Sequence, residues 1–331
     1  MNRLTNIDVS KGLLMLLVVY YHALCIVAAV CLGLCNEEFL FETPYLFRSF
    51  FMIAFVVISG ITSRFERSLK DQIVHDAKVL LLPAIIISTI VGILCPEAVD
   101  KGDVSSLSRI ILYGGGAWFI TAMFLSRVMY KIASQIREDQ IRYCALIVIW
   151  IFGVVFDYYI PNDYEFWYLP KAMIFTPYFE VGRIVNKVEL TRMPVAMVSF
   201  VAYLLVIPFL WWYGDKTPHF SDSSSVSLRM VPLFGFLSII GSIACYEAGK
   251  IINQNRFIEF IGRNSLVFYL MHIVFLFMAC KLYNAYFIIT EPSSWVIYGV
   301  LTTLMLGALL WCSMFSILLN TKYLKWILGK F

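Results

Sequence analysis

The sequence predicts an all-α, polytopic integral membrane protein with about ten transmembrane helices and with both termini in the cytoplasm. Three observations lead to this fold class. Of the 331 residues, 60% are hydrophobic and only 15% are charged, whereas soluble domains carry about 25% charged residues. The apolar residues gather in runs long enough to cross a bilayer, and the basic residues concentrate at every second boundary between runs. We expect one membrane-embedded domain that spans residues 1–331.

Ten apolar runs have the length of about 17 to 25 residues that a transmembrane helix requires. They cover residues 12–34, 45–63, 79–95, 109–131, 142–158, 171–187, 194–213, 228–249, 264–283 and 295–320. The sixth run is polar inside, since it contains Glu180 and, one turn later, Arg183. A carboxylate at that depth needs a cation or a proton. Arg183 is the expected partner, which favours a structural role for this pair.

The positive charges orient these helices. Cytoplasmic loops are enriched in Lys and Arg, and most of the 26 basic residues fall into alternate loops when the N-terminus is inside. An even number of spans then returns the C-terminus to the same side. The segment 64–78 mixes charged and apolar residues and predicts an amphipathic helix along the cytoplasmic interface. The predicted location is the inner (plasma) membrane, which the chain crosses many times.

The composition argues against two classes of function. The basic residues are dispersed at helix ends and form no stripe along one element, so a nucleic acid is not an expected partner. The eight cysteines are scattered through apolar runs, without a CxxC pair and without histidines at the spacing of metal ligands. No metal site is therefore expected.

The first apolar run carries two ionisable residues on one face. Lys11 and His22 are eleven residues apart, which is three turns of an α-helix and about 16 Å of rise. Lys11 then lies at the cytoplasmic surface and His22 near the middle of the bilayer. An ionisable residue at that depth indicates a functional site, because its burial without a partner costs about 3 kcal/mol or more. The alternative is a hydrogen-bonded histidine that only packs between helices.

The ninth run repeats this feature. Asn264 or Ser265 can cap the start of a helix, and Tyr269 and His272 follow Ser265 at offsets of four and seven, along one face. His272 then lies at a depth similar to that of His22. Two histidines at matching depth on two helices predict a polar site inside the membrane.

Two further places indicate the close approach of a helix or a ligand. Three glycines at residues 114–116 precede Trp118 in the fourth run. Glycines that break a membrane helix are tolerated where protein or a water-filled cavity surrounds the backbone, so we expect a cavity near Trp118. The second run ends in Ser59 and Gly60, a small pair that admits a ligand or another helix, with ordinary helix packing as the simpler interpretation.

Five short motifs follow one another between residues 7 and 272. They read IDVSKGLLMLLVVYYHA, FFMIAFVVISG, KVLLLPAI, AWFI and IGRNSLVFYLMH. In this order they resemble the signatures of the integral-membrane acyltransferase 3 family. Its members have a basic residue and a histidine separated by ten residues in the first helix, a pattern that Lys11 and His22 match with Lys in place of the commoner Arg. Two positions differ, because Phe51 replaces the histidine of a His-Met-Pro motif and Ile273 replaces a proline.

The resemblance implies an O-acyltransferase. Such an enzyme takes an acyl group, most often acetyl, from cytoplasmic acyl-CoA and passes it to a sugar hydroxyl of a surface or secreted polysaccharide or of its lipid-linked precursor. Acetyl-CoA is then a donor substrate, and no permanently bound cofactor is expected. The other expected partners are the glycan acceptor, membrane lipid, and the polysaccharide synthesis machinery or a second copy of the chain.

The residues fit this chemistry. His22 is the expected general base, because desolvation keeps its imidazole neutral, and His272 and Tyr269 complete the predicted catalytic set. The oxyanion that forms at the thioester carbonyl needs a hydrogen-bond donor, for which Tyr269, Ser59 and Trp118 are candidates. The phosphates of coenzyme A need cations on the cytoplasmic side. The predicted substrate- and donor-binding residues are Lys11, Ser59, Arg64, Lys78, Trp118, Arg263 and Ser265.

Two other functions remain open. A multi-span transporter or flippase for a glycan or a lipid-linked intermediate also uses broken helices and histidines near the middle of the membrane. The sequence has no two halves with matching interruptions, which counts against this alternative. A module without catalysis, which only helps to assemble a polysaccharide export complex, is the third interpretation.

Overall fold

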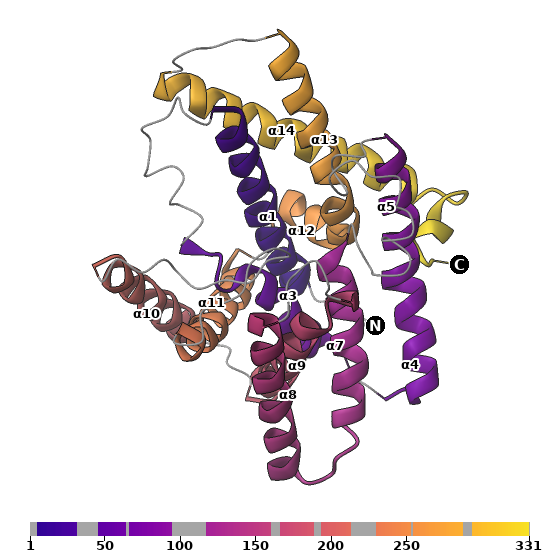
Figure 1. Cartoon of the computed structure of the whole chain (residues 1–331), viewed down its shortest axis with the longest axis vertical. Coiled ribbons are helices and arrows are strands. Elements are labelled where there is room, and N and C mark those ends of the chain that lie inside the picture. Colours follow the sequence, from indigo (N-terminus) through magenta and orange to yellow (C-terminus); the bar gives the residue numbers. More distant parts are fainter. Residues whose placement is uncertain are drawn as a thin grey trace.

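The computed structural model describes residues 5–31, 46–63, 66–94, 117–159, 166–188, 193–212, 230–252, 254–286 and 293–330. These residues form helices and the turns between them, with no strand in the ranges described (Figure 1). The α-helices are α1 (Thr5–Cys31), α3 (Phe51–Thr62), α4 (Leu69–Asp76), α5 (Leu82–Leu94), α7 (Trp118–Ala133), α8 (Asp139–Tyr159), α9 (Leu169–Val188), α10 (Met193–Trp212), α11 (Val231–Ile251), α12 (Arg256–Arg263), α13 (Ser265–Tyr286) and α14 (Ser294–Leu319).

Within the described part of the chain, six helical stretches are long and apolar enough to cross a membrane. They are Thr5–Val27, Leu69–Ile93, Asp139–Tyr159, Val231–Ile251, Ser265–Tyr283 and Trp295–Leu319. The other four predicted runs also contain helices, α3, α7, α9 and α10, which do not meet the same criteria over their described residues. The chain is thus an all-helical membrane protein. The count of ten crossings and the cytoplasmic side of the termini remain predictions.

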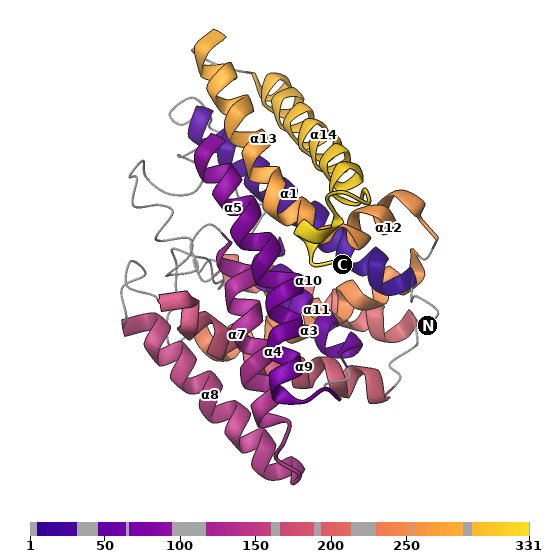
Figure 2. The ribbon, with the colours of Figure 1, turned by 90° about the vertical axis from the view of Figure 1, so that its right-hand side faces the viewer.

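Helix α4 is not the separate amphipathic helix along the membrane interface that the sequence predicted over residues 64–78. One continuous helical stretch, Leu69–Ile93, runs through a π-helical segment at Ala77–Leu81 and forms a single column in Figure 2. The reason lies in its polar residues, because Gln72 and Asp76 are buried and hydrogen-bonded to each other at 2.6 Å. Because these polar side chains form hydrogen bonds inside the bundle, the helix does not have to lie at the membrane surface to keep them in contact with water.

Helix α1 lies in the interior of the bundle and contacts α3, α11, α12, α13 and α14 (Figure 1). Its first half packs on α12 through the backbone of two glycines. A Cβ atom added at Gly12 would overlap the carbonyl oxygen of Ile258 in α12, and one added at Gly262 would overlap the carbonyl oxygen of Asp8 in α1. Because backbone atoms cannot move aside as a flexible side chain does, these contacts fix α1 against α12.

The substitution Gly262→Ala is expected to lower the melting temperature of the protein. The added methyl group meets the α1 backbone, and overpacking of this kind costs about 1–3 kcal/mol. The matched control is Gly299→Ala in α14, where an added Cβ meets no atom within 4 Å and where alanine is the better helix former. Thermal unfolding of both variants in one detergent measures the difference. Equal melting temperatures would contradict the close contact of α1 with α12.

Candidate functional site

His22 of α1 and His272 of α13 are in direct contact. The Nε2 atom of His272 lies 3.2 Å from Nδ1 of His22, and the two ring centroids are 4.8 Å apart. His272 is fully buried, whereas His22 is partly exposed. The structure therefore brings together the two histidines that the sequence placed at matching depth on separate helices. We call them the histidine pair.

The hydrogen-bond partners assign the protons of the histidine pair. His272 Nδ1 lies 2.9 Å from the carbonyl oxygen of Phe268, which only accepts hydrogen bonds, so Nδ1 carries the proton and Nε2 accepts. His22 Nδ1 lies 2.9 Å from the carbonyl oxygen of Val18 and 3.2 Å from His272 Nε2, both of which accept. His22 Nδ1 therefore carries the proton. The basic lone pair of a neutral His22 is then on Nε2, on the side of the ring that faces away from these partners.

Tyr269 connects the histidine pair to the start of α7, next to Trp118. The Tyr269 ring centroid lies 6.2 Å from that of His272, and the Tyr269 hydroxyl accepts a hydrogen bond from the Phe119 N–H at 3.4 Å. Trp118 is the first residue of α7 and the neighbour of Phe119 in the chain. The three glycines that precede Trp118 lie outside the described residues, so the cavity expected near Trp118 stays a prediction.

Three other predicted residues lie along the first half of α1 and its neighbours. Because α1 is one continuous helix, Lys11 and His22 share it, separated by about 16 Å of rise as predicted. Arg263 ends α12 and forms an ion pair with Asp8 of α1, with Nε and Oδ2 3.4 Å apart. Ser265 begins α13. Lys11, Arg263 and Ser265 thus belong to three helices, α1, α12 and α13, that contact one another.

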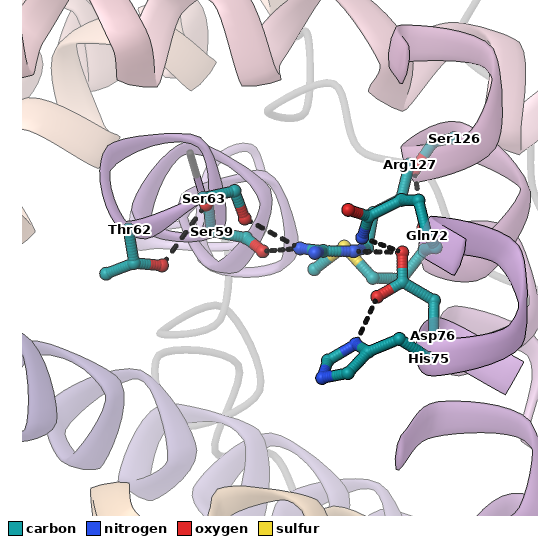
Figure 3. Close-up of polar contacts among 9 residues, drawn as sticks. Ser59, Thr62, Ser63, Gln72, His75, Asp76, Ser126 and Arg127 are labelled. Atoms are coloured by element: carbon teal, nitrogen blue, oxygen red, sulfur yellow. Dashed lines mark hydrogen bonds and ion pairs between the residues drawn. The ribbon is translucent and has the colours of Figure 1, made fainter. Parts of the chain in front are cut away.

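Ser59 belongs to a separate polar cluster, which Figure 3 shows between α3 and α4. Arg127 of α7 donates hydrogen bonds to the Ser59 and Ser63 hydroxyls at 2.8 and 2.9 Å. Its Nε donates to Asp76 at 2.9 Å, and Asp76 also accepts from Gln72. The guanidinium therefore joins α3, α4 and α7, which favours a structural role for Ser59.

Ser59, Lys78 and Arg64 are not brought to the histidine pair by described contacts. Phe51 packs on Tyr21, the neighbour of His22, with ring centroids 5.9 Å apart, and Ser59 lies eight residues further along α3, about 12 Å away. Lys78 is exposed in the π-helical segment. Arg64 lies outside the described residues.

The buried carboxylate of Glu180 has the partner that the sequence predicted. Arg183 donates to it from Nε at 3.0 Å and from Nη2 at 2.5 Å. Tyr130 and Arg142 also bond to this carboxylate, from α7 and α8. The group joins three helices, in agreement with the structural role expected for Glu180.

Sequence reasoning missed one ion pair and one further arginine inside the bundle. Asp157 of α8 and Lys171 of α9 form an ion pair at 3.1 Å, in which both side chains are 0% exposed. Arg48, in the turn before α3, donates a hydrogen bond to the Tyr21 hydroxyl at 3.3 Å. Arg48 is the only charged residue of the apolar run 45–63, and that isolation was the signal in the sequence.

A bundle of apolar helices in which a fully buried histidine contacts a partly exposed one defines a polytopic membrane protein with a polar pair between its helices. A family model described as an acyltransferase domain matches residues 4–314, nearly the whole chain, and the chain belongs to this acyltransferase 3 family. The family predicted from the sequence motifs is thus confirmed, and acyl transfer is the activity that membership implies. No curated protein and no solved structure matched the chain.

Proposed function

We propose that this protein is an O-acetyltransferase, which transfers an acetyl group from cytoplasmic acetyl-CoA to a sugar hydroxyl of a surface polysaccharide or its lipid-linked precursor. The observation that carries the proposal is the contact between His22 and His272 inside a member of an acyltransferase family. A sugar hydroxyl is a weak nucleophile at neutral pH, and a neutral imidazole supplies the base it needs.

The arrangement supports a direct transfer. Nε2 of His22 takes the hydroxyl proton while the hydroxyl oxygen attacks the thioester carbonyl. The imidazolium that forms is stabilised through its Nδ1–H by Nε2 of His272, which the Phe268 carbonyl holds in the accepting tautomer. The sulfur of coenzyme A then leaves and takes the proton from His22. Among the predicted oxyanion donors, Tyr269 is the one with a ring contact to the histidine pair.

Lys11 is the proposed contact for a phosphate of the donor. Lys11→Ala is expected to raise the apparent KM for acetyl-CoA by about tenfold or more, since a charge-assisted hydrogen bond contributes about 1.5–3 kcal/mol. The turnover number should change less, because Lys11 lies about 16 Å along α1 from His22. Initial rates at varied acetyl-CoA concentration measure both constants. Lys187→Ala, an exposed lysine of α9, is the control, and an unchanged KM in Lys11→Ala would contradict the assignment.

The activity itself is tested with purified protein in lipid nanodiscs, radiolabelled acetyl-CoA, and a panel of lipid-linked and polymeric glycans. We expect free CoA to appear only when an acceptor is present, together with label on the glycan. The transporter alternative predicts instead that unmodified glycan crosses the membrane of a sealed vesicle without consumption of acetyl-CoA. Transport without CoA release would replace the proposal.

A further inference from the structure

A positively charged residue, Arg48, lies near the histidine pair, separated from it by the ring of Tyr21. The Arg48 guanidinium donates to the Tyr21 hydroxyl from Nη2, at 3.3 Å, and its central carbon lies 5.2 Å from the Tyr21 ring centroid. The Tyr21 ring meets the His22 ring edge to face, with centroids 5.1 Å apart. A charged side chain inside a membrane bundle is costly, so its presence beside a reactive group indicates a function.

The turn that carries Arg48 is held on both sides. Phe47 is buried and packs on Tyr20 and Phe51, with ring centroids 6.0 and 5.7 Å away. The carbonyl oxygen of Ser49 accepts a hydrogen bond from the buried Ser238 hydroxyl of α11 at 2.8 Å. These contacts fix the backbone of Arg48 before any ligand binds, which reduces the entropic cost of binding.

The described residues around Arg48 become more exposed with distance from the centre of the bundle. His272 is fully buried, Tyr21, His22 and Arg48 are partly exposed, and Cys25, one turn beyond His22 on α1, is exposed. His22 and Arg48, both partly exposed, therefore flank the same partly exposed side chain, that of Tyr21. A molecule that reaches His22 past the Tyr21 ring would also meet the guanidinium.

The two cations near His22 lie at different ends of the site. Lys11 is ten residues before Tyr21 on the straight helix α1, about 15 Å away, whereas Arg48 touches Tyr21 itself. The phosphates of the donor are assigned to the Lys11 end by the proposed function. A second cation at the His22 end is then suited to an anion on the other substrate.

We propose that Arg48 binds an anionic group of the acceptor, a phosphate or a carboxylate, and so holds the acceptor hydroxyl at His22. This inference rests on the proposed function and specifies its acceptor. Arg is the residue best suited to such a group, because its planar guanidinium offers paired donors to two oxygens. An acidic sugar and the phosphate of a lipid carrier both provide this chemistry.

The experiment compares three acceptors with the intact protein in nanodiscs of neutral lipid. Octyl glucoside is neutral, octyl glucuronide carries a carboxylate, and farnesyl phosphoryl glucose carries a phosphate. We expect kcat/KM for at least one anionic acceptor to exceed that for octyl glucoside by about tenfold or more, the size of one charge-assisted bond. The anionic acceptor that is preferred distinguishes an acidic sugar from a lipid phosphate.

Arg48→Gln is expected to remove most of this preference and to leave turnover of octyl glucoside unchanged, while Arg48→Lys retains a part of the preference. Arg137→Gln, which changes an exposed arginine between α7 and α8, is the matched control. An equal loss with neutral and anionic acceptors, or no preference in the unaltered protein, would overturn the proposal. An equal loss is what a purely structural Arg48 or one that stabilises the oxyanion predicts.

A binding measurement separates this inference from the proposed function. Without acetyl-CoA, farnesyl phosphate should raise the melting temperature of the unaltered protein more than farnesol does, and Arg48→Gln should abolish the difference. Equal stabilisation by both compounds would refute an anion site at Arg48. If farnesyl phosphate binds selectively but no acceptor is acetylated, the acetyltransferase proposal fails and the anion site remains.

Discussion

His22→Ala is expected to reduce acetyl transfer by about 10²- to 10⁴-fold, the range that a general base contributes. The imidazole is the group whose Nε2 takes the acceptor proton in the proposed reaction, and alanine offers no base in its place. The loss should appear in the turnover number at saturating acetyl-CoA, because Lys11 and the donor site are intact. The turnover number is measured by detecting the released CoA with a thiol reagent. The melting temperature of the variant is measured in parallel.

Two other histidine variants make this result specific. His272→Asn should give a smaller loss of turnover, since it removes the acceptor of the His22 Nδ1–H but leaves the base. His75→Ala alters a histidine of α4 that is 40% exposed and bonds only to Asp76 among the described contacts, and it should retain full activity. Undiminished turnover in a folded His22→Ala protein would remove His22 from the mechanism.

Asp157→Ala is expected to destabilise the protein by about 3–5 kcal/mol, the cost of removing one partner of a buried ion pair. The reason is the position of Lys171, which is 0% exposed and would keep a charge in an apolar contact between α8 and α9. Thermal unfolding in a mild detergent should show a clearly lower melting temperature for Asp157→Ala than for the unaltered protein.

The double variant Asp157→Leu/Lys171→Met tests the cause of this destabilisation. Replacing both charges of a buried pair by apolar side chains of similar volume is often neutral or stabilising. The double variant should therefore unfold near the temperature of the unaltered protein. A double variant as unstable as the single one would show that the two charges do not compensate each other.

The sequence predicted much of the helical architecture, because long apolar runs leave few alternatives to a membrane helix. Each of the ten runs contains a helix of the structure. The similar depth of His22 and His272 was also predictable, since His22 lies ten residues into the first apolar run and His272 eight residues into the ninth. The separate interfacial helix predicted over residues 64–78 was wrong, because this segment continues into the next helix as one stretch, Leu69–Ile93. The polarity of residues 69–76 indicated a membrane surface, whereas Asp76 is satisfied by Arg127 from another helix.

The parts of the site that could not be predicted depend on contacts between helices distant in sequence. Ser59 was a plausible oxyanion donor by its residue type, and only the position of Arg127 shows that its hydroxyl is engaged elsewhere. Arg48 was visible in the sequence as the one charge of an apolar run. Its position near His22 depends on its contact with Tyr21 of α1, which the sequence did not predict. Helical periodicity predicts which face of a helix a residue lies on, but only the packing of the helices shows which residues of other helices it contacts.

The glycine contacts hold α1 against α12, so that the distance between Lys11 and His22 along α1 stays constant while the donor is bound. In the proposed reaction, Lys11 holds coenzyme A by a phosphate and His22 acts where the thioester lies, so the distance between them must match the extended pantetheine arm. Because that arm is the same in every acyl-CoA, the carbonyl reaches His22 whatever the length of the acyl chain. Selection among acyl groups must then come from the space beyond the carbonyl, and deletions or insertions of residues in α1 between Lys11 and His22 would impair all donors alike.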